Sequence, residues 1–308
     1  MHKAVLTKEL IKYLKINPDG IYVDCTGGGG GHAKRVHENL SEKGRLIICD
    51  RDSDAVKRLK NLFGSYDNVD VVNSNFAEID KVLDSLAVKY VDGLYADFGL
   101  SNFQLTDETR GFSFKKNGFL DMRMDQAGGI TAYEVVNSYP KETIANILKK
   151  YGEESFAERI AEKIVKERII NKIENTHHLA NVISGAIPKR FHKLNQHPAT
   201  KSFQAIRIFI NKELESIESL LNKIDKIVLK GGRVAFISFH SLEDRLVKDM
   251  LNYYQKDCIC PPEFPECCCN KVSVFKVINK KPITPTKAEI EKNPLSRSAK
   301  LRIAEKLI

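Results

Sequence analysis

The sequence predicts an α/β protein, in which a Rossmann-like sheet carries an inserted, mainly helical second domain. Short apolar runs alternate with helical periodicity over residues 21–97, the pattern of a parallel sheet with crossover helices. Five consecutive glycines, at 27–31, directly follow the first of these runs. Strand patterns stop after residue 97 and resume near residue 233, so the segment between them interrupts the sheet domain.

The expected strands are apolar stretches bounded by polar or glycine-containing segments. Four precede the insertion and three follow it: 21–25, 46–50, 69–72, 93–97, 233–239, 272–277 and 301–304. Helical periodicity lies between the first four; Ala55, Leu59 and Leu62, for example, share one helix face. This alternation predicts parallel strands covered by helices on both faces.

The chain changes character after the fourth strand. Residues 98–140 are rich in Gly, Asn, Asp and Phe without a clear period, so we expect an extended active-site loop. Helices are expected next over 144–151, 156–165 and 176–187, the last capped by Thr176, and then as one long helix over 203–221.

The domain organisation follows from these elements. A helical insertion for substrate recognition is expected at 104–212, and it interrupts one discontinuous domain formed by residues 1–103 and 213–308.

Composition excludes several classes of protein. The chain has 308 residues and 42% hydrophobic content, enough to bury a core. No apolar run approaches the ~18 residues of a membrane span, and the start, MHKAVLTKEL, lacks the apolar core of a signal peptide. We therefore expect a folded, cytoplasmic protein with no membrane partner. The sequence leaves open whether it forms a homodimer.

Positive charge is concentrated in two segments. The net charge is +9; residues 104–212 hold 18 Lys/Arg against 12 Asp/Glu, and residues 271–308 hold 10 against 3. Residues 188–212 contain six Lys/Arg and no acidic residue. Such segments suggest a polyanionic partner rather than an ordinary solvated surface. The predicted phosphate-contacting residues are Lys189, Arg190, Lys193, Lys201 and Arg207.

Glycines 27–31 and Asp50 together indicate a nucleotide-like cofactor. A strand that runs into a glycine turn and then a helix lets the backbone approach a ligand closely. Asp50 ends the second strand nineteen residues after Gly31, near the ~20-residue spacing at which a carboxylate holds ribose hydroxyls. Alone, the glycines could be a flexible loop and Asp50 a solvated acid; their order in one unit favours binding.

Asp97 and His240 stand where strands are expected to end at the ligand-binding edge of the sheet. Asp97 could lie beside both cofactor and substrate, or simply cap a loop or helix. His240 could face the substrate or be a hydrogen-bonded structural residue. A serine hydrolase is not expected, because no G-x-S-x-G motif surrounds Ser238 or Ser241.

Five of the seven cysteines are clustered at 258–269. The odd total and the absence of a secretion signal predict reduced thiols, and Cys25 and Cys49 are interpreted as core residues of strands. Two C-x-C pairs could supply four thiolates to a structural zinc ion, although this spacing is tighter than the usual C-x2-4-C. The alternative is reduced free thiols. The candidate ligands are Cys258, Cys260, Cys267 and Cys269.

The ordered motifs resemble the RsmH (MraW) family of bacterial 16S rRNA (cytosine-N4)-methyltransferases, which use S-adenosylmethionine. The resemblance covers nearly the whole chain. Its motifs are Gly30-Gly31-His32, Asp50-Arg51-Asp52, the strand end at Asp97, Arg110 to Phe114, Leu120 to Asp125, Tyr151 to Glu154, His197 to Thr200, Ser238 to Arg245, Asn293-Pro294 and Arg297-Ser298.

The resemblance implies an S-adenosylmethionine-dependent methyltransferase sheet with cofactor contacts at named positions. These are Gly30, Gly31 and His32 at the turn, Asp50 at the ribose, Phe76 beside the adenine, and Asp97 and Gln104 near the methionine end. The family's Asp-Leu-Gly-Val-Ser-Ser is Asp97-Phe98-Gly99-Leu100-Ser101-Asn102 here, so no role is carried over to the last position.

The implied reaction is methylation of the N4 amine of a cytidine in the decoding region of 16S rRNA, within the small ribosomal subunit. Asp97 is the first candidate to accept a proton and His240 the second. A nicotinamide-dependent dehydrogenase is the competing enzyme, but His32 stands where its glycine motif expects a small residue. The non-enzyme alternative is a ribosome assembly factor that binds RNA without catalysis.

Overall fold

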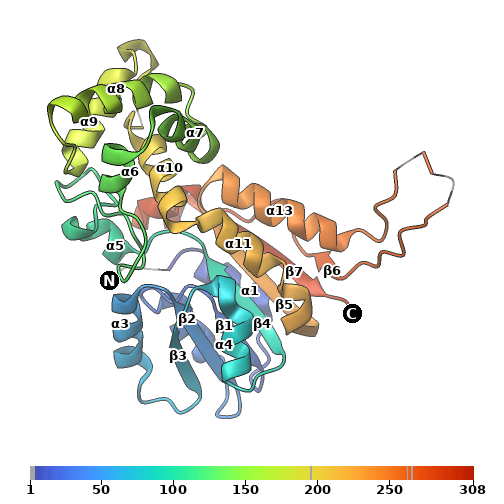
Figure 1. Ribbon diagram of the computed structural model, residues 1–308. Coiled ribbons are helices and arrows are strands. Elements are labelled where there is room, and N and C mark those ends of the chain that lie inside the picture. Colours follow the sequence, from blue (N-terminus) through green and yellow to red (C-terminus); the bar gives the residue numbers. More distant parts are fainter. Residues whose placement is uncertain (1–3, 195, 262, 265) are drawn as a thin grey trace. The chain divides into compact units, whose positions relative to one another are not determined.

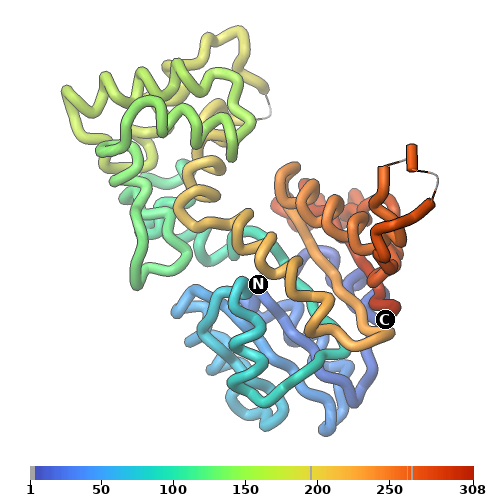
Figure 2. The backbone as a smooth tube through the Cα atoms, turned by 45° about the vertical axis from the view of Figure 1, so that its right-hand side comes forward, coloured from blue at the N-terminus to red at the C-terminus, as the bar shows by residue number. Residues whose placement is uncertain are grey.

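The chain forms two compact units in the computed structural model, which describes residues 4–194, 196–261, 263–264 and 266–308. One unit comprises Met1–Gly99 with Leu214–Ile308, and the other Leu100–Glu213. Figure 2 follows the chain out of the first unit, through the green and yellow segments of the second, and back. The second unit thus begins at Leu100 rather than 104 and ends at Glu213 rather than 212.

The first unit is built on a seven-stranded sheet in the order β3-β2-β1-β4-β5-β7-β6. Its strands are β1 (Ile21–Asp24), β2 (Arg45–Asp50), β3 (Val69–Asn73), β4 (Val91–Asp97), β5 (Val228–Ser238), β6 (Phe275–Val277) and β7 (Lys300–Lys306). Strands β1 to β5 are parallel, which confirms the predicted α/β sheet. Strand β7 is antiparallel to both neighbours, a direction that apolar periodicity does not encode.

Helices cover both faces of this sheet, as the alternation predicts (Figure 1). Alternate strand residues point to opposite faces, so Val23 and Ile47 join one core while Tyr22 and Leu46 join the other. One face packs on α1 (Thr7–Leu14), α2 (Gly31–His37) and α3 (Ser53–Phe63), and the other on α4 (Ile79–Ser85), α11 (Glu213–Leu221), α12 (Ile224–Ile227) and α13 (Ser241–Gln255). The short helices η1 (Phe76–Glu78), α14 (Lys287–Lys292) and η4 (Pro294–Ser298) complete the unit.

The second unit is helical, and two of its helix ends differ from the expectation. Its elements are α5 (Asn102–Thr106), η2 (Glu108–Arg110), α6 (Ala132–Ser138), α7 (Lys141–Gly152), α8 (Ala157–Ile170), α9 (Thr176–Ala186), η3 (Lys189–Phe191) and α10 (Thr200–Asn211). The single helix expected over 203–221 is wrong, because Lys212 adopts φ 48° and ends α10. Asn175, not Thr176, caps α9; its side chain accepts a hydrogen bond from the His178 amide.

No helix in the described part of the chain is long and apolar enough to cross a bilayer.

The segment between α5 and α6 lacks periodicity but is held by buried polar contacts. Arg110 is 5% exposed and donates to the carbonyl oxygens of Arg123 and Met124 at 3.0 and 2.9 Å. Asp121 accepts two hydrogen bonds from the Arg123 guanidinium, at 2.8 and 2.9 Å. Gly111 has φ 66°, and an added Cβ would overlap the carbonyl oxygen of Phe119. The segment is therefore a fixed structure rather than a loose loop.

We predict that Gly111→Ala destabilises the second unit by roughly 2–4 kcal/mol, from the left-handed backbone and the overlap with Phe119. Gly128→Ala is the matched control, because a Cβ there meets nothing within 4 Å. It should change stability by less than about 0.5 kcal/mol. Urea unfolding of both variants measures the difference, and equal midpoints would contradict this description of the loop.

Candidate functional site

The glycine turn is shaped by its packing against β2 and α3. Gly27 donates its amide to the Cys49 carbonyl at 2.9 Å, and a Cβ on it would lie 2.6 Å from side-chain atoms of Ile48 and Leu59. Gly30 has φ 76° and stands before the first residue of α2. A side chain is thus excluded at Gly27 by crowding and disfavoured at Gly30 by conformation.

Asp50 is tied to this turn at the end of β2. Its Oδ2 accepts a hydrogen bond from the Gly28 amide at 2.7 Å, and its Oδ1 accepts one from the Asp52 amide at 2.8 Å. Burial raises the pKa of Asp50, while the hydrogen bonds from the Asp52 and Gly28 amides act to lower it. A carboxylate oxygen accepts more than one hydrogen bond, so Asp50 keeps capacity for a hydroxyl ligand.

Asp24 and Asp97 end the neighbouring strands β1 and β4 at the same edge of the sheet. Oδ2 of Asp24 and Oδ1 of Asp97 are buried and have no hydrogen-bond partner among the described residues. Oδ2 of Asp97 lies 3.7 Å from Nδ1 of His32, and the Asp97 side chain keeps 25% of its surface exposed. The Asp97 amide donates to the Thr26 hydroxyl at 2.7 Å, which links the two strand ends.

The surroundings favour the neutral form of both acids. Burial raises the pKa of Asp24 to about 7, while the Thr26 amide and the nearby Tyr95 hydroxyl act to lower it. Burial, and then the negative charges of Asp24 and Glu243, raise the pKa of Asp97 well above its usual range. Unsatisfied buried oxygens are costly. This edge is therefore suited to a ligand that carries positive charge or hydrogen-bond donors.

Phe76 follows β3 and stands at the start of η1, capped by Asn75. Its ring centroid lies 5.7 Å from that of Phe98, which in turn stacks on Phe236 at 5.7 Å with an 8° interplanar angle. Phe76 is half-buried. A half-buried ring held by an aromatic row can offer surface to a flat ligand.

Gln104 belongs to the second unit, where it forms a reciprocal cap on α5. The backbone amide of Gln104 donates to the Ser101 hydroxyl at 3.2 Å, and its side-chain Oε1 accepts from the backbone amide of Ser101 at 3.1 Å. The predicted contact of Gln104 with a cofactor stays a prediction.

His240 caps α13 together with Glu243. Its Nδ1 accepts the Glu243 amide at 3.3 Å, while Oε2 of Glu243 accepts the amides of Phe239 and His240 at 2.8 and 3.3 Å. Nε2 of His240 lies 3.1 Å from Oε1 of Glu243, outside hydrogen-bond geometry. The capping role is thus the one that the contacts define, and proton transfer by His240 stays a prediction.

The basic residues predicted to contact RNA divide into two kinds. The first kind is exposed: Lys189, Arg190 and Lys193 lie in or beside η3, and the Arg190 guanidinium lies 5.0 Å from the centroid of the half-exposed Phe191 ring.

The second kind is hydrogen-bonded within the unit. Lys201 donates to the Glu153 carbonyl at 2.9 Å. Arg207 makes two hydrogen bonds of 2.9 Å to the Glu213 carboxylate. Its charge is therefore compensated within the unit.

Comparison with known proteins decides the family. The model of the MraW methylase family matches residues 1–307. The chain belongs to the MraW methylase family. The resemblance seen in the sequence motifs is thereby confirmed, and the dehydrogenase alternative is wrong.

Relatives agree with this assignment over their full length. The ribosomal RNA small subunit methyltransferases H of Caldicellulosiruptor bescii and Clostridioides difficile strain 630 are 48% and 47% identical over 306 and 307 residues, each covering 99% of both chains. Among solved structures, a putative rRNA methylase from Clostridium thermocellum covers all of both chains with a TM-score of 0.45 and 11% identity.

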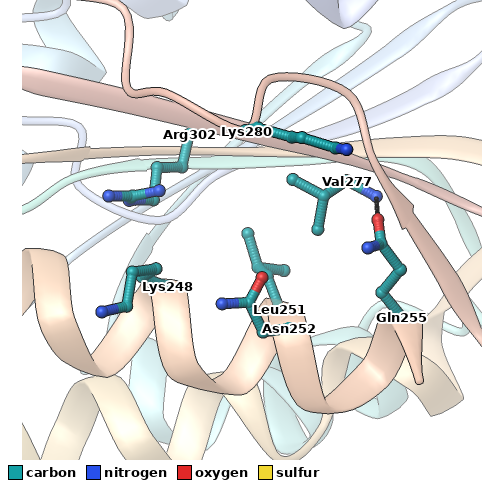
Figure 3. Close-up of a pocket in the computed structure, with 7 residues that line it drawn as sticks. All are labelled: Lys248, Leu251, Asn252, Gln255, Val277, Lys280 and Arg302. Atoms are coloured by element: carbon teal, nitrogen blue, oxygen red, sulfur yellow. Dashed lines mark hydrogen bonds between the residues drawn. The ribbon is translucent and has the colours of Figure 1, made fainter.

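A separate pocket lies on the first unit, between α13 and strands β6 and β7 (Figure 3). It has a volume of about 270 Å³, below the range typical of ligand sites, and Gln255 closes one end by accepting the Val277 amide at 2.8 Å. Its lining residues are Lys248, Leu251, Asn252, Gln255, Val277, Lys280 and Arg302. None of these lining residues is among the residues predicted to contact the cofactor.

Sequence reasoning missed Asp24, Thr26 and Glu243. Asp24 is the last residue of an apolar strand just before the glycine turn. Asp50 and Asp97 also end strands, and the same position could have predicted Asp24 as a site residue. Glu243 is 0% exposed, and its position three residues after His240 fits a capping box.

We predict that Asp24→Asn stabilises the ligand-free protein at high pH. The wild-type carboxyl ionises at about pH 4 when unfolded but at about 7 when folded, so stability is lost as the pH rises between these values. The variant should be more stable by on the order of 2–4 kcal/mol at pH 8, and the difference should shrink toward pH 4. Thermal unfolding at both pH values measures this.

The matched control is Asp67→Asn, which removes the same charge from an exposed position. Its unfolding curves should stay close to wild type at each pH. A gain from Asp24→Asn that is equal at pH 4 and pH 8 would show that the Asp24 carboxyl is not the group responsible.

Proposed function

We propose that this chain transfers a methyl group from S-adenosylmethionine to the N4 amine of a cytidine in the decoding region of 16S rRNA, on the small ribosomal subunit. Family membership and the names of the relatives support rRNA methylation. The observation that carries the cofactor assignment is the pair of buried, unpartnered oxygens on Asp24 and Asp97 beside the glycine turn. The finer assignment to cytidine N4 rests on the motif resemblance.

The residues at the sheet edge fit this cofactor. When bound, S-adenosylmethionine supplies a methyl group activated by a positively charged sulfonium. Asp24 and Asp97 would balance positive charge, Asp50 would bind ribose hydroxyls, and Phe76 would cover the adenine. The remaining proposed contacts are Gly30, Gly31 and His32 at the turn and Gln104 near the methionine end.

Asp97 is the proposed proton acceptor. The lone pair of cytosine N4 is delocalised into the ring, so catalysis depends on holding the amine in line with the methyl donor. A carboxylate that accepts an N–H bond from the amine orients it and receives the proton once the new bond has formed. Because burial raises the pKa of Asp97 above its usual range, this carboxylate is a stronger base than an exposed one.

The second unit is the proposed RNA-binding part. A base in structured RNA must leave its stack before it reaches a buried site. Lys189, Arg190, Lys193 and Lys201 would hold phosphates, and Phe191 offers a half-exposed ring on which a base can stack. Arg207 is left out, because Glu213 already compensates its charge.

The proposal predicts N4-methylcytidine as the product. Small subunits from a strain lacking this enzyme are incubated with the protein and labelled S-adenosylmethionine, and the modified nucleoside is mapped. Asp97→Asn is the control, and we expect it to lower turnover by at least about 100-fold, because the amide cannot take up the proton. Methylation at cytosine C5 or on another base would refute the N4 assignment. Failure to bind S-adenosylmethionine in calorimetry would instead favour an assembly factor without catalysis.

The RNA-binding proposal predicts a change in salt dependence. Removing four phosphate contacts should weaken small-subunit binding and lower the slope of log affinity against log salt by about 3, at ~0.7–0.9 per contact. Cofactor affinity should be kept. The quadruple variant changes to alanine Lys189, Arg190, Lys193 and Lys201.

A second quadruple variant is the matched control, since it removes the same charge from another part of the same unit. Its residues are Lys149, Lys163, Lys166 and Lys172, of which Lys149 and Lys166 form ion pairs with Glu158 and Glu162. If both variants lower the slope equally, net charge rather than the η3 segment accounts for binding.

A further inference from the structure

Residues 256–274 connect α13 to β6 without regular secondary structure in their described part. A connection of this length needs something to order it. Its apolar residues do not form a core: Ile259, Phe264 and Val272 are 49%, 53% and 57% exposed. The connection instead contains five cysteines, none of which is in a disulfide.

Four of these cysteines bring their sulfur atoms together. The ligand atoms of Cys258, Cys260, Cys267 and Cys269 all lie within 4.8 Å of one another. The Sγ atoms of Cys267 and Cys269 are 3.6 Å apart, and those of Cys269 and Cys258 are 3.9 Å apart. Zinc–sulfur bonds of about 2.3 Å in a tetrahedron place neighbouring sulfurs about 3.8 Å apart. These two separations match a tetrahedral tetrathiolate site, and the other pairs among the four lie within 4.8 Å.

Backbone amides point at the same sulfur atoms. Ile259 donates to Sγ of Cys269, Cys260 to Sγ of Cys258, and Cys268 to Sγ of Cys260, each at 3.4 Å. Such donors stabilise the thiolate form, which is the form that binds metal. The connection thus has two arms, one with Cys258 and Cys260 and the other with Cys267 and Cys269. Their sulfur atoms lie together, and three of them accept hydrogen bonds from backbone amides.

We propose that Cys258, Cys260, Cys267 and Cys269 bind one Zn²⁺ ion. Four protein ligands leave no open position, so the ion is structural and takes no part in methyl transfer. It joins the two arms of the connection and substitutes for the apolar core that this segment lacks. The site is independent of the proposed reaction, because it uses no residue of the carboxyl edge.

Cys268 is the fifth thiol and provides a matched control. Its Sγ lies 3.7 Å from that of Cys260, but it is outside the set of four whose atoms are mutually close. Cys268→Ser therefore removes a neighbouring thiol without removing a ligand.

The test measures metal content and affinity in the full-length protein reconstituted with Zn²⁺ alone. We expect one zinc per chain by elemental analysis in wild type and in Cys268→Ser. The double variant Cys258→Ser with Cys267→Ser should bind zinc more than about 100-fold more weakly in competition with a chromophoric chelator, a larger loss than second-shell changes cause. Far-UV circular dichroism should be the same in all three proteins, because the sheet and helices lie outside the connection, and this separates loss of metal from loss of fold.

Three results would overturn the proposal. The first is substoichiometric zinc in folded wild type, with all five clustered thiols alkylated at rates that the metal does not change, which means reduced free thiols. The second is iron with visible absorption, which means a cluster. The third is equal loss of zinc in Cys268→Ser and the double variant, which means a different ligand set. Neither cofactor binding nor RNA methylation enters these measurements, so they stand apart from the proposed function.

Discussion

The electrostatics of the sheet edge depend on two acids, Asp24 and Asp97, each of which has one buried oxygen atom without a hydrogen-bond partner among the described residues. Their charges oppose one another, and Glu243 adds a third negative charge nearby. Two amides of the glycine turn donate elsewhere, that of Gly27 to the Cys49 carbonyl and that of Gly28 to the Asp50 carboxylate. Nδ1 of His32 lies 3.7 Å from Oδ2 of Asp97, and a cationic ligand would add further positive charge at this edge. The geometry therefore favours a cationic cofactor over the anionic phosphates that glycine turns often bind.

The sheet could be predicted from the sequence because strand periodicity and glycine position are local signals. The first four expected strands match β1 to β4 closely, and each later one overlaps an observed strand. The sequence-based predictions are wrong or incomplete where one residue ends a helix, or where a distant contact sets the direction of a strand. Lys212 in a left-handed conformation breaks a helix whose apolar face continues unbroken across it. The antiparallel direction of β7 depends on pairing with β5, which ends 62 residues earlier in the chain, and no local pattern specifies it.

The candidate site was predicted less completely, because residue type alone does not reveal partners. Arg207 looks like its basic neighbours in sequence, yet only the fold shows that it pairs with Glu213. His240 looks like a catalytic histidine at a strand end, and its contacts are those of a helix cap. Asp24 was overlooked beside five glycines, although its position matches that of Asp97 on a neighbouring strand. In each case the burial and hydrogen bonds of the side chain, rather than the residue type, distinguish a structural role from a chemical one.

The charge state of Asp97 links cofactor binding to catalysis under the proposed function. A carboxyl group whose pKa is raised by burial and by two neighbouring acids keeps its proton to a higher pH than an exposed carboxyl group does. The protonated form cannot accept a proton from an amine. A cation held against Asp24 and Asp97 favours their ionised forms, so the same event that fills the site also creates the base. Under this proposal the two acids would serve two purposes in sequence: both select a positively charged ligand, and Asp97 becomes the proton acceptor only when that ligand is present.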